Sequence, residues 1–599
     1  RLMKLKKWIR WYKGKHREVF NLMENEVIVG IDLGTSTSEI AVLKDGKPWV
    51  IPDLEGNTII PSVVGVDEEG NILVGHKAQA QLLTRPDETV FEVKRLMGTD
   101  SQINMGGRLW TPEEITAEII KYLIGYAQER LGTPIGRAVI TVPAYFSEAQ
   151  RRATIEAGQI AGLVVERIIN EPTAASLDYG IDHMEDCKNI LIYDFGGGTL
   201  DVTVLEFFTG VLDVKASAGN SKLGGKDFDN AIIDFLLEQF ENKYHFDLSA
   251  DPRAMMRLRD AAERSKIKLS AEMTTHIILP FIAEIKNEPV ALDVELSREQ
   301  FEDLIRDQVA STAEPVYQAL EDARLKPPDL DLILLVGGTT KIPLVQRFVT
   351  ELLGKKPEAL VDPDLAVARG AAIQAGIISG ELDHQKDILI TDVCPYTLGI
   401  SILGEIGGMM MPDVMSVIIK RNTTIPTEQT QRYCTVVDNQ KSVEIEVYQG
   451  DYKQASQNTN LGTFVLSDLP KAPAGDEKVD VTFAYDINGL LQVTATIAST
   501  GKNASITIDP KKTDQLISEQ NLEHWQDAPG ARRYRRLVQK AEKLLEADEA
   551  GYLAFELDRL IKDLKSGLIS GQDQEKLEKL RKELNDLVYE LEMNQNADE

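Results

Sequence analysis

The chain has 599 residues, and its 95 acidic against 66 basic side chains give a formal net charge of −29 at pH 7. Phosphate backbones repel so acidic a chain, which argues against general binding to nucleic acids or anionic membranes. No run of about 18 apolar residues occurs, so the sequence predicts no membrane span. Its three cysteines, Cys187, Cys394 and Cys434, form neither a metal-binding pair nor a disulfide framework, which indicates a reducing compartment.

Residues 1–22 differ from the rest, because they carry eight Lys or Arg side chains against one acid, Glu18. They lack the apolar stretch of roughly 7–15 residues that a secretory signal needs. We expect a basic extension upstream of a natural start at Met23. A basic surface anchor is the alternative.

Three short apolar runs, at 27–31, 190–193 and 332–336, each end in a glycine-rich turn. Continuous apolar runs of this length predict strands that are buried on both faces. The segments between them include helix-like stretches at 112–128, 147–161 and 227–240. This alternation predicts an α/β fold.

The first two runs belong to an internal repeat. Asp32-Leu-Gly-Thr and Asp194-Phe-Gly-Gly-Gly-Thr each join two strands, and the two aspartates are 162 residues apart (194 − 32). A repeat of this length indicates two similar lobes.

The pattern changes after about residue 384. Apolar and polar residues alternate at 442–448, 478–485 and 491–497, the period of a half-buried antiparallel sheet, and Asn488-Gly489 predicts a two-residue hairpin turn. From about 511 the pattern is helical. A leucine seam with spacings of three and four predicts a helical bundle, with coiled-coil dimerisation as the alternative; it comprises Leu577, Leu580, Leu584, Leu587 and Leu591.

The Asp-x-Gly turns suit phosphate chemistry. Glycine lets backbone N–H groups and the threonine hydroxyl approach phosphate oxygens, and the aspartate at the strand end can orient water around Mg²⁺. Two such turns, with Gly337-Gly338 as a third, predict a phosphate cradle between two lobes.

Several motifs resemble the seventy-kilodalton heat-shock chaperones, the DnaK family. They are Val29-Gly-Ile-Asp-Leu-Gly-Thr, Val142-Pro-Ala-Tyr-Phe, Asn170-Glu-Pro-Thr-Ala-Ala, Asp194-Phe-Gly-Gly-Gly-Thr, Val336-Gly-Gly-Thr-Thr-Lys-Ile-Pro, Asn422-Thr-Thr-Ile-Pro-Thr and Tyr485-Asp-Ile-Asn-Gly-Leu-Leu. The resemblance covers about residues 27 to 590. Thr391-Asp-Val-Cys-Pro-Tyr-Thr-Leu-Gly, with Arg421-Asn-Thr-Thr, is similar to the HscC branch.

The resemblance implies an α/β actin-like two-lobed ATPase domain, followed by an antiparallel β-sandwich that binds peptides and an α-helical lid. We accordingly expect a basic extension at 1–22, a nucleotide-binding domain at 23–382, a linker at 383–391, a β-sandwich at 392–510 and the lid at 511–599.

The resemblance also implies a site for ATP or ADP with Mg²⁺. Asp32 and Asp194 would organise the water shell of Mg²⁺, and Glu171 would position that shell or the attacking water. The phosphates would contact Gly34, Thr35, Ser36, Gly196, Gly197, Gly198 and Thr199. The nucleoside would contact Glu263, Lys266, Ser270, Gly337, Gly338 and Asp364.

Two positions depart from the family pattern. Alignment through 73–81 places Gln79 where the family has its catalytic lysine, and a neutral amide cannot offset the charge that develops on the γ-phosphoryl group. Slow hydrolysis is therefore expected, unless Lys77 takes over the role. Ile267 replaces an arginine that stacks on adenine, so weaker nucleotide binding is expected.

In the β-sandwich, the resemblance places Leu403 and Val436 over a bound peptide. Ile400, Tyr433, Val443 and Ile445 would line the central pocket. The segment 404–417 also contains Met409, Met410, Met411 and Met415, which suit an adaptable surface.

The linker, around Asp387-Ile-Leu-Ile, would dock on the ATPase in one nucleotide state only. Arg167 and Asn170 would meet a J-domain co-chaperone. The end of the chain, Asn594-Gln-Asn-Ala-Asp-Glu, lacks the Glu-Glu-Val-Asp tail of eukaryotic cytosolic members, so a bacterial cytoplasmic protein is expected.

The expected function is an ATP-dependent chaperone of the stress response that binds unfolded or extended apolar peptides, with a J-domain protein and a nucleotide exchange factor as partners. The alternatives are a nucleotide-gated regulatory protein with little ATP hydrolysis, which Gln79 favours, and a small-molecule kinase on the same core. A kinase would have no use for a peptide-binding domain after residue 390.

Overall fold

The computed structural model is described from Val27 onward, so the predicted basic extension 1–22 lies outside the described residues. It describes 27–181, 183, 187–208, 210–382, 389–406, 409–507, 525–527, 531–546 and selected helical positions between 557 and 588. Within this part of the chain, no helix combines the length and the hydropathy that crossing a membrane requires.

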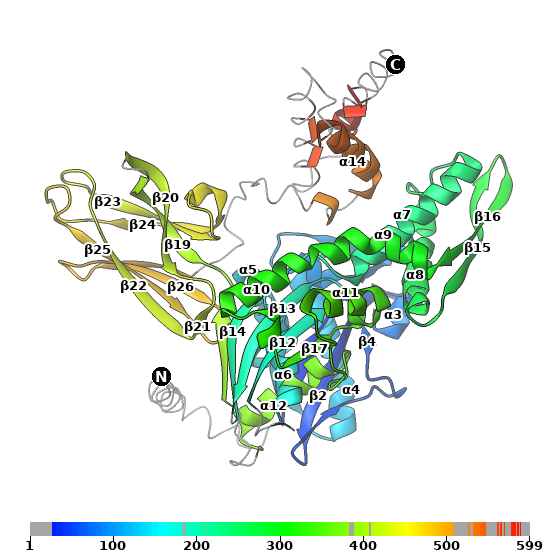
Figure 1. Ribbon diagram of the computed structural model, residues 1–599, viewed down its shortest axis with the longest axis horizontal. Coiled ribbons are helices and arrows are strands. Elements are labelled where there is room, and N and C mark those ends of the chain that lie inside the picture. The colour runs from blue at the N-terminus through cyan, green and yellow to red at the C-terminus, as the bar shows by residue number, and fades with distance from the viewer. Residues whose placement is uncertain are drawn as a thin grey trace.

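The first lobe is built on a six-stranded mixed sheet with the order β11-β10-β1-β2-β3 and with β4 beside β2 (Figure 1). Its strands are β1 (Val27–Leu33), β2 (Thr37–Lys44), β3 (Lys47–Val50), β4 (Ile60–Pro61), β10 (Ile135–Val142) and β11 (Val164–Asn170). The predicted run at 27–31 is β1, which is buried as expected. Helices α4 (Pro112–Leu131) and α5 (Glu148–Ile160) cover one face, and capping boxes at Thr111 and Ser147 start them.

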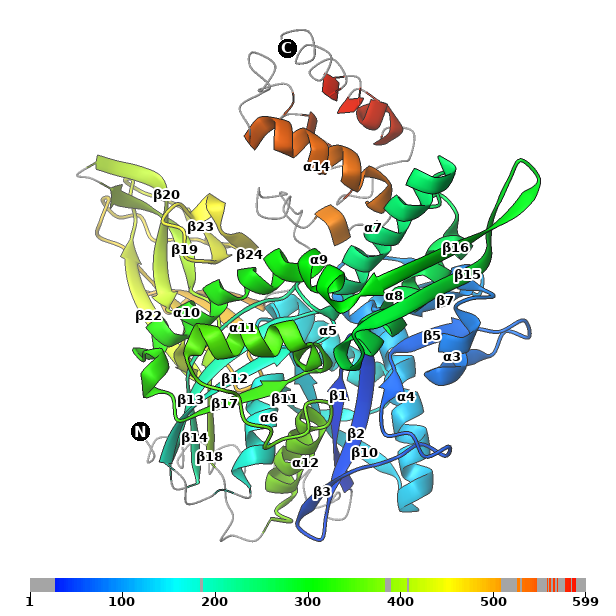
Figure 2. The same ribbon diagram turned by 45° about the vertical axis from the view of Figure 1, so that its right-hand side comes forward.

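The second lobe repeats this arrangement with the order β17-β12-β13-β14-β18-β21 (Figure 2). Its strands are β12 (Cys187–Phe195), β13 (Leu200–Phe208), β14 (Val211–Asn220), β17 (Leu332–Val336), β18 (Leu389–Cys394) and β21 (Thr423–Ile425). Helices α7 (Gly225–Tyr244), α8 (Pro252–Ala271), α9 (Arg298–Ser311), α10 (Ala313–Ala323) and α11 (Pro343–Leu353) belong to this lobe. The two predicted lobes are therefore present.

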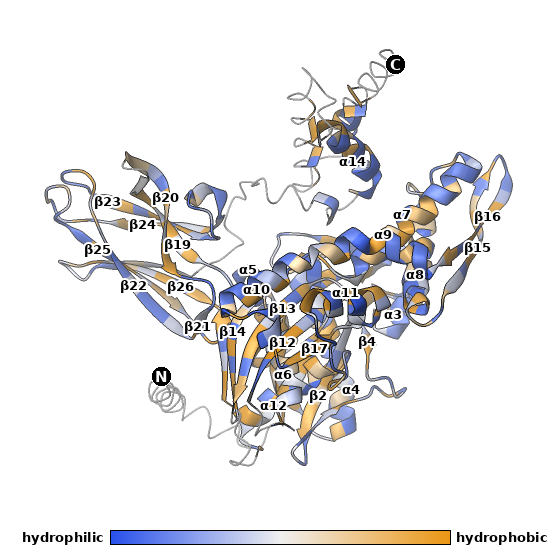
Figure 3. Cartoon of the chain, viewed as in Figure 1, coloured by the Kyte–Doolittle hydropathy of each residue, from blue (hydrophilic) through white to orange (hydrophobic). Residues whose placement is uncertain are grey.

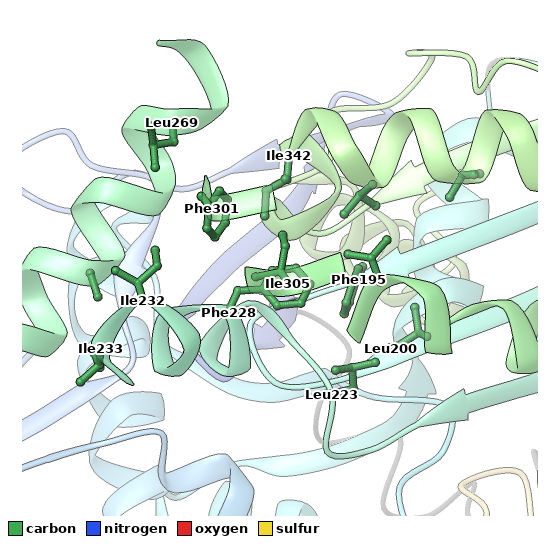
Figure 4. Close-up of a cluster of buried hydrophobic side chains, with 14 of the residues drawn as sticks. Phe195, Leu200, Leu223, Phe228, Ile232, Ile233, Leu269, Phe301, Ile305 and Ile342 are labelled. Carbon is green, nitrogen blue, oxygen red and sulfur yellow. The ribbon is translucent and has the colours of Figure 1, made fainter. Parts of the chain in front are cut away.

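Apolar residues gather in the two sheets and on the helix faces that cover them, whereas outer surfaces are hydrophilic (Figure 3). In the second lobe, Phe195 and Leu200 from the sheet meet Phe228 of α7 and Phe301 of α9 in one cluster (Figure 4). Phe195 and Phe228 lie edge to face, with their ring centroids 5.5 Å apart. This core fixes the end of β12, where the second Asp-x-Gly turn begins.

Two helices, α6 (Glu171–Gly180) and α12 (Ala366–Ser379), pack between the two sheets. They cross so closely that a Cβ atom at Gly370 would lie 1.7 Å from the carbonyl oxygen of Ala174. Only glycine allows this crossing, and the crossing sets how the two lobes face each other.

We therefore expect Gly370→Ala to lower the free energy of unfolding of the two-lobed domain by about 3 kcal/mol, because both helix backbones must move apart. Gly125→Ala is the matched control, since Gly125 lies on the exposed face of α4 with open space around it. It should gain about 0.5–1 kcal/mol from helix propensity. Thermal unfolding measures both, and equal melting temperatures for the two variants would contradict the argument.

Smaller β-sheets and hairpins are attached to the two lobes. The strands β5 (Val63–Val66), β6 (Ile72–Val74) and β7 (Thr89–Phe91) form a sheet beside α3 (His76–Gln81). Two hairpins are β8 (Ile103–Met105) with β9 (Arg108–Trp110), and β15 (Thr274–Ile285) with β16 (Glu288–Ser297).

After residue 394 the chain forms two four-stranded sheets around one core, as the alternating pattern predicts. One contains β19 (Leu398–Ile406), β20 (Met409–Ile419), β23 (Ser442–Gln449) and β24 (Thr459–Ser467); the other contains β22 (Thr427–Cys434), β25 (Lys478–Tyr485), β26 (Leu491–Ile497) and β27 (Asn503–Thr507). The hairpin around Asn488-Gly489 is confirmed. Its two-residue turn is wrong, because Tyr485 pairs with Leu491 and the loop spans 486–490, which the Asp486 carboxylate holds through the N–H groups of Asn488 and Leu490.

The β domain docks on the two-lobed domain. The end of the predicted linker lies in β18, which pairs in parallel with β14 and so extends the sheet of the second lobe. On the other side of β18, β21 adds a further strand. The Arg421 guanidinium donates to Asp322 of α10 at 3.0 Å, and the Asn422 amide donates to the same carboxylate at 2.9 Å.

The C-terminal region is helical where it is described. Helix α14 (Arg532–Glu546) packs its apolar side against residues of the region 557–588, including four leucines of the predicted seam; Leu591 lies outside the described residues. Arg535 donates to Asp234 of α7 at 2.9 Å, and Arg536 donates to Glu241 of the same helix. Helix α14 thus contacts the second lobe (Figure 2).

Candidate nucleotide site

A cavity of about 360 Å³ lies between the two lobes. Every residue that the sequence analysis assigned to nucleotide, phosphate or Mg²⁺ lines it, with the single exception of Gln79. The lining residues come from the ends of β1, β12 and β17, from α8 and from the segment before α12. Parallel strands ending at the same edge bring together turns that are far apart in the sequence.

Asp32 and Asp194 occupy equivalent places in the two lobes. Asp32 is the second-last residue of β1, where its Oδ1 accepts a hydrogen bond of 2.7 Å from the Thr141 hydroxyl. Asp194 lies near the end of β12, and its Oδ2 is buried without a hydrogen-bond partner. Burial is the largest cause, and repulsion from Glu171 the second, of a raised pKa at both aspartates. The pKa of Asp32 rises to about 7, and the pKa of Asp194 rises well above its ordinary value. Two buried carboxylates without a cation of their own fit a divalent ion that arrives with nucleotide.

Glu171 starts α6 and points into the same cavity. Lys94 Nζ donates to Glu171 Oε1 at 2.6 Å, and both side chains are nearly buried. Lys94 belongs to a short 3₁₀ turn at 93–96, which follows Glu92 in a left-handed conformation. A buried ammonium group beside the phosphate turns can offset charge that develops on a transferred phosphoryl group.

The expectation that Gln79 occupies the catalytic position is wrong. Gln79 is exposed on α3, whose inner side is formed by Ala78 and Gln81, and neither Gln79 nor Lys77 lines the cavity. The cation beside Glu171 in the cleft is Lys94, fifteen residues further along (94 − 79). Sequence reasoning missed Lys94 because the motif was aligned through a short helix and a loop. Without the fold, nothing in such a segment fixes which residue corresponds to the family's lysine. The signal that could have found it is the lysine-arginine pair next to Leu96 and Gly98.

The glycines of the second turn bring the two lobes into contact. A Cβ atom at Gly197 would lie 2.3 Å from Ser36 Oγ, and one at Gly198 would lie 2.6 Å from Thr35 Oγ1. The backbone of one turn therefore faces the hydroxyl groups of the other. Backbone N–H groups and hydroxyls that converge in this way suit phosphate oxygens.

Residues of α8 and of the segment before α12 line the far end of the cavity. Lys266 forms an ion pair of 2.8 Å with Asp229, and Glu263 accepts from Lys226 at 3.0 Å. Lys341, which the sequence analysis did not assign, pairs with Asp364. Ile267 also lines the cavity and is 63 % exposed, so it offers an apolar surface to a flat ring.

Arg167 and Asn170 lie at the contact between the two-lobed domain and the β domain. Asn170 is buried; its amide donates to Asp392 at 2.9 Å, and its Oδ1 accepts from Arg151 at 2.7 Å. Arg167 donates to Gln374 of α12 at 2.8 Å, and burial lowers its pKa. Asn488 of the β domain accepts two hydrogen bonds. Its carbonyl oxygen accepts from Arg151 at 3.5 Å, and its side-chain Oδ1 accepts from the Ile168 N–H at 3.0 Å.

The six residues that the resemblance assigned to peptide binding all lie in the β domain. Ile400 and Ile445 belong to its core, with Tyr433 and Val443 packed against them, and the Tyr433 hydroxyl lies 2.9 Å from Ser416 Oγ. Leu403 and Val436 are exposed. The exposed side chains of Met409, Met410 and Met411 lie on β20, which pairs with β19 beyond Leu403.

The protein-family model described as Hsp70 protein matches residues 28–104 and 100–599, nearly the whole chain. The chain therefore belongs to the Hsp70 family, as its motifs predict. Members of this family are ATPases that act as ATP-dependent chaperones and bind unfolded peptides and J-domain co-chaperones. Together with the mixed sheets, this membership fits an actin-like ATPase domain joined to a β-rich region.

Proposed function

We propose that this protein hydrolyses Mg-ATP in the cavity between its lobes and uses the cycle to control binding of extended apolar peptides by its β domain. One observation carries the proposal: strand β18 connects the β domain to the sheet that forms part of the nucleotide cavity. Asp392, at the start of the β domain, lies on β18, and β18 is part of the sheet whose strand β12 presents Asp194.

When Mg²⁺ is bound with nucleotide, it supplies a Lewis acid for the phosphates, and Asp32 and Asp194 would hold its water shell. Glu171 would orient the attacking water, and Lys94 would steady the γ-phosphoryl group. Thr199, at the end of the second glycine turn, would donate its hydroxyl to a phosphate oxygen. Glu263, Lys266 and Ser270 of α8, with Gly337, Gly338 and Asp364, would surround the nucleoside.

The contacts between the domains give a physical route for control. Arg151, Asn170, Asp392 and Asn488 form one hydrogen-bonded group across the boundary, and loss of the docked arrangement would break the bonds from Arg151 to Asn488 and from Asn170 to Asp392. Such a group has two discrete states, docked and released, which a ligand can bias. We propose that ATP favours docking, that hydrolysis prompted by a J-domain protein favours release, and that nucleotide exchange restores docking. Arg167, which is only partly buried, would carry the J-domain contact; Asn170 is buried between Asp392 and Arg151 and would not be accessible in the docked arrangement.

The alternative of a regulatory protein with little hydrolysis loses its support, because it rested on Gln79. Within the family, the HscC-like branch remains our assignment on the motif from Thr391 and on Arg421. Single-turnover hydrolysis by the chain from Met23 onward, with and without an apolar heptapeptide and a J-domain, tests the function. Turnover that neither addition changes would contradict coupling, and absence of turnover would leave the regulatory alternative.

For the peptide site, we expect Val443→Phe to weaken binding of an apolar heptapeptide by at least ~10-fold, because the larger ring would occupy the central pocket that the resemblance assigns to a peptide side chain. ATP turnover without peptide should stay near the wild-type rate, since Val443 is far from the cleft. Fluorescence anisotropy of a labelled peptide measures the change. The control is Val465→Phe, at an exposed position of β24; equal affinity for both variants would place the pocket elsewhere.

A further inference from the structure

Three consecutive methionines, Met409, Met410 and Met411, begin strand β20 of the β domain. We call them the methionine run. Their side chains are 67 %, 63 % and 43 % exposed, and the core of the domain, as far as it is described, is built without them. Because successive side chains of a strand point to opposite faces, both faces of β20 present an exposed thioether to solvent here.

The methionine run lies beside the place that the resemblance assigns to a bound peptide. Met411 pairs with Gly404 of β19, directly after the exposed Leu403, and the other two methionines pair with the next two residues of β19. Strand β20 is the outer strand of its sheet, whose order is β20-β19-β23-β24 (Figure 2). The run therefore continues the apolar surface that begins at Leu403 out to the edge of the sheet.

Exposure distinguishes the run from most other described methionines. Met97 and Met105 are 2 % and 1 % exposed, because they belong to the core of the first lobe. Met273 is 66 % exposed and lies in the second lobe, directly before β15. An oxidant dissolved in water reaches exposed thioethers first. Such an oxidant would therefore act on three neighbouring side chains of the β domain while the core methionines stay shielded.

We propose that the methionine run is a site of reversible oxidation, at which conversion of the thioethers to sulfoxides weakens peptide binding by the β domain. The inference rests on the proposed function, because it assigns a regulation to that peptide site. A methionine sulfoxide is polar, and an apolar peptide side chain that covers it removes its hydrogen bonds to water without replacing them. The fold should persist, since the run is exposed and lies outside the described core.

A peroxide is a sufficient oxidant for this step. A lone pair of the thioether sulfur attacks one oxygen of hydrogen peroxide, so that an S–O bond forms and the O–O bond breaks. The sulfur is oxidised by two electrons, and the departing hydroxide takes the proton of the transferred oxygen and leaves as water. Methionine sulfoxide reductases reverse the step with two thiols, which become a disulfide while the oxygen leaves as water.

The rival explanation is oxidation of the Cys434 thiol, which is exposed at the end of β22 in the same domain. A triple variant, in which all three methionines of the run are replaced by leucine, separates the two explanations. Leucine keeps the volume and the apolar character but has no sulfur, and the variant still contains Cys434. The matched control is Met273→Leu, which removes an equally exposed thioether outside the β domain.

The experiment measures the affinity of a labelled, methionine-free apolar heptapeptide by fluorescence anisotropy, before and after treatment of the full chain with hydrogen peroxide. Catalase removes the peroxide before the peptide is added, and mass spectrometry locates the added oxygen atoms. Wild type and Met273→Leu should lose affinity by at least ~10-fold, whereas the triple variant should stay within about twofold of its own untreated form. Thermal unfolding confirms that all treated proteins are folded.

Reversal gives a second readout. Methionine sulfoxide reductases A and B with dithiothreitol should restore the affinity of oxidised wild type, and dithiothreitol alone should not, because it reduces oxidised thiols but leaves sulfoxides in place. Restoration by dithiothreitol alone would assign the effect to a cysteine and overturn the inference.

Unchanged affinity in wild type whose methionine run is oxidised would also overturn the inference, as would an equal loss in the triple variant. A run that stays unoxidised while Met273 is oxidised would contradict it as well. In each of these cases the untreated wild type still binds the peptide, so the proposed function stands. A folded, untreated wild type that does not bind the peptide would refute the proposed peptide site and the oxidation site together.

Discussion

Replacing Lys94 by methionine is expected to slow single-turnover ATP hydrolysis by on the order of 10²–10³, the usual effect of removing one preorganised donor to a developing charge. Methionine keeps the length and much of the volume of the side chain but removes the ammonium group that lies 2.6 Å from Glu171. The affinity for a fluorescent ATP analogue should change far less, because the glycine turns and hydroxyls that contact the phosphates remain.

Lys77→Met and Gln79→Ala are the controls for this experiment. Both residues are exposed on α3 and outside the cavity, so both variants should hydrolyse ATP at the wild-type rate. A rate for Lys94→Met within about twofold of wild type, together with a loss of rate in Lys77→Met, would restore the role of α3 and remove Lys94 from the mechanism.

The second large effect is expected from Gly197→Val, which should weaken ATP binding by at least ~100-fold. The first side-chain atom at this position would lie 2.3 Å from Ser36 Oγ and 3.3 Å from Ser36 Cβ. The serine hydroxyl can rotate away from one added atom, but the branched valine leaves no direction free and also fills the space that a phosphate needs. The two phosphate turns would therefore be held apart.

Isothermal calorimetry with Mg-ATP measures this loss, and the melting temperature shows whether the variant is folded. Gly125→Val serves as the control, since it introduces the same side chain at a glycine with open space on α4 and should bind ATP as wild type does. Equal ATP affinity for folded Gly197→Val and for wild type would mean that the phosphates lie outside this cradle.

Much of the nucleotide site was determined by the sequence. An apolar run of this length followed by Asp-x-Gly indicates a buried strand that ends in a tight turn, and its repetition at Asp32 and Asp194 predicts two lobes whose turns face one nucleotide. The α/β pattern and the later alternating pattern likewise predict the two sheets of the ATPase and the separate β domain, because side-chain periodicity follows directly from which faces are buried.

Only the tertiary structure determines which side chain of this region supplies the positive charge beside Glu171. Gln79 and Lys94 both lie in a region of short elements, where a shift of one turn changes which side chain points inward. The strands that hold this region are only three or four residues long, so no periodic pattern fixes the register, and the choice of Lys94 depends on how the 3₁₀ turn at 93–96 packs against α4.

The same holds for the contacts between domains. Nothing in the sequence shows that Asn170 contacts Asp392 or that Asn488 contacts Ile168, since the two residues of each pair are more than two hundred positions apart and each of the three is an ordinary polar residue of a strand or a loop. Their meeting depends on β18 adding to the edge of the second lobe's sheet. Backbone hydrogen bonds at a sheet edge can accept many sequences, so only the folded chain determines which strand occupies that edge.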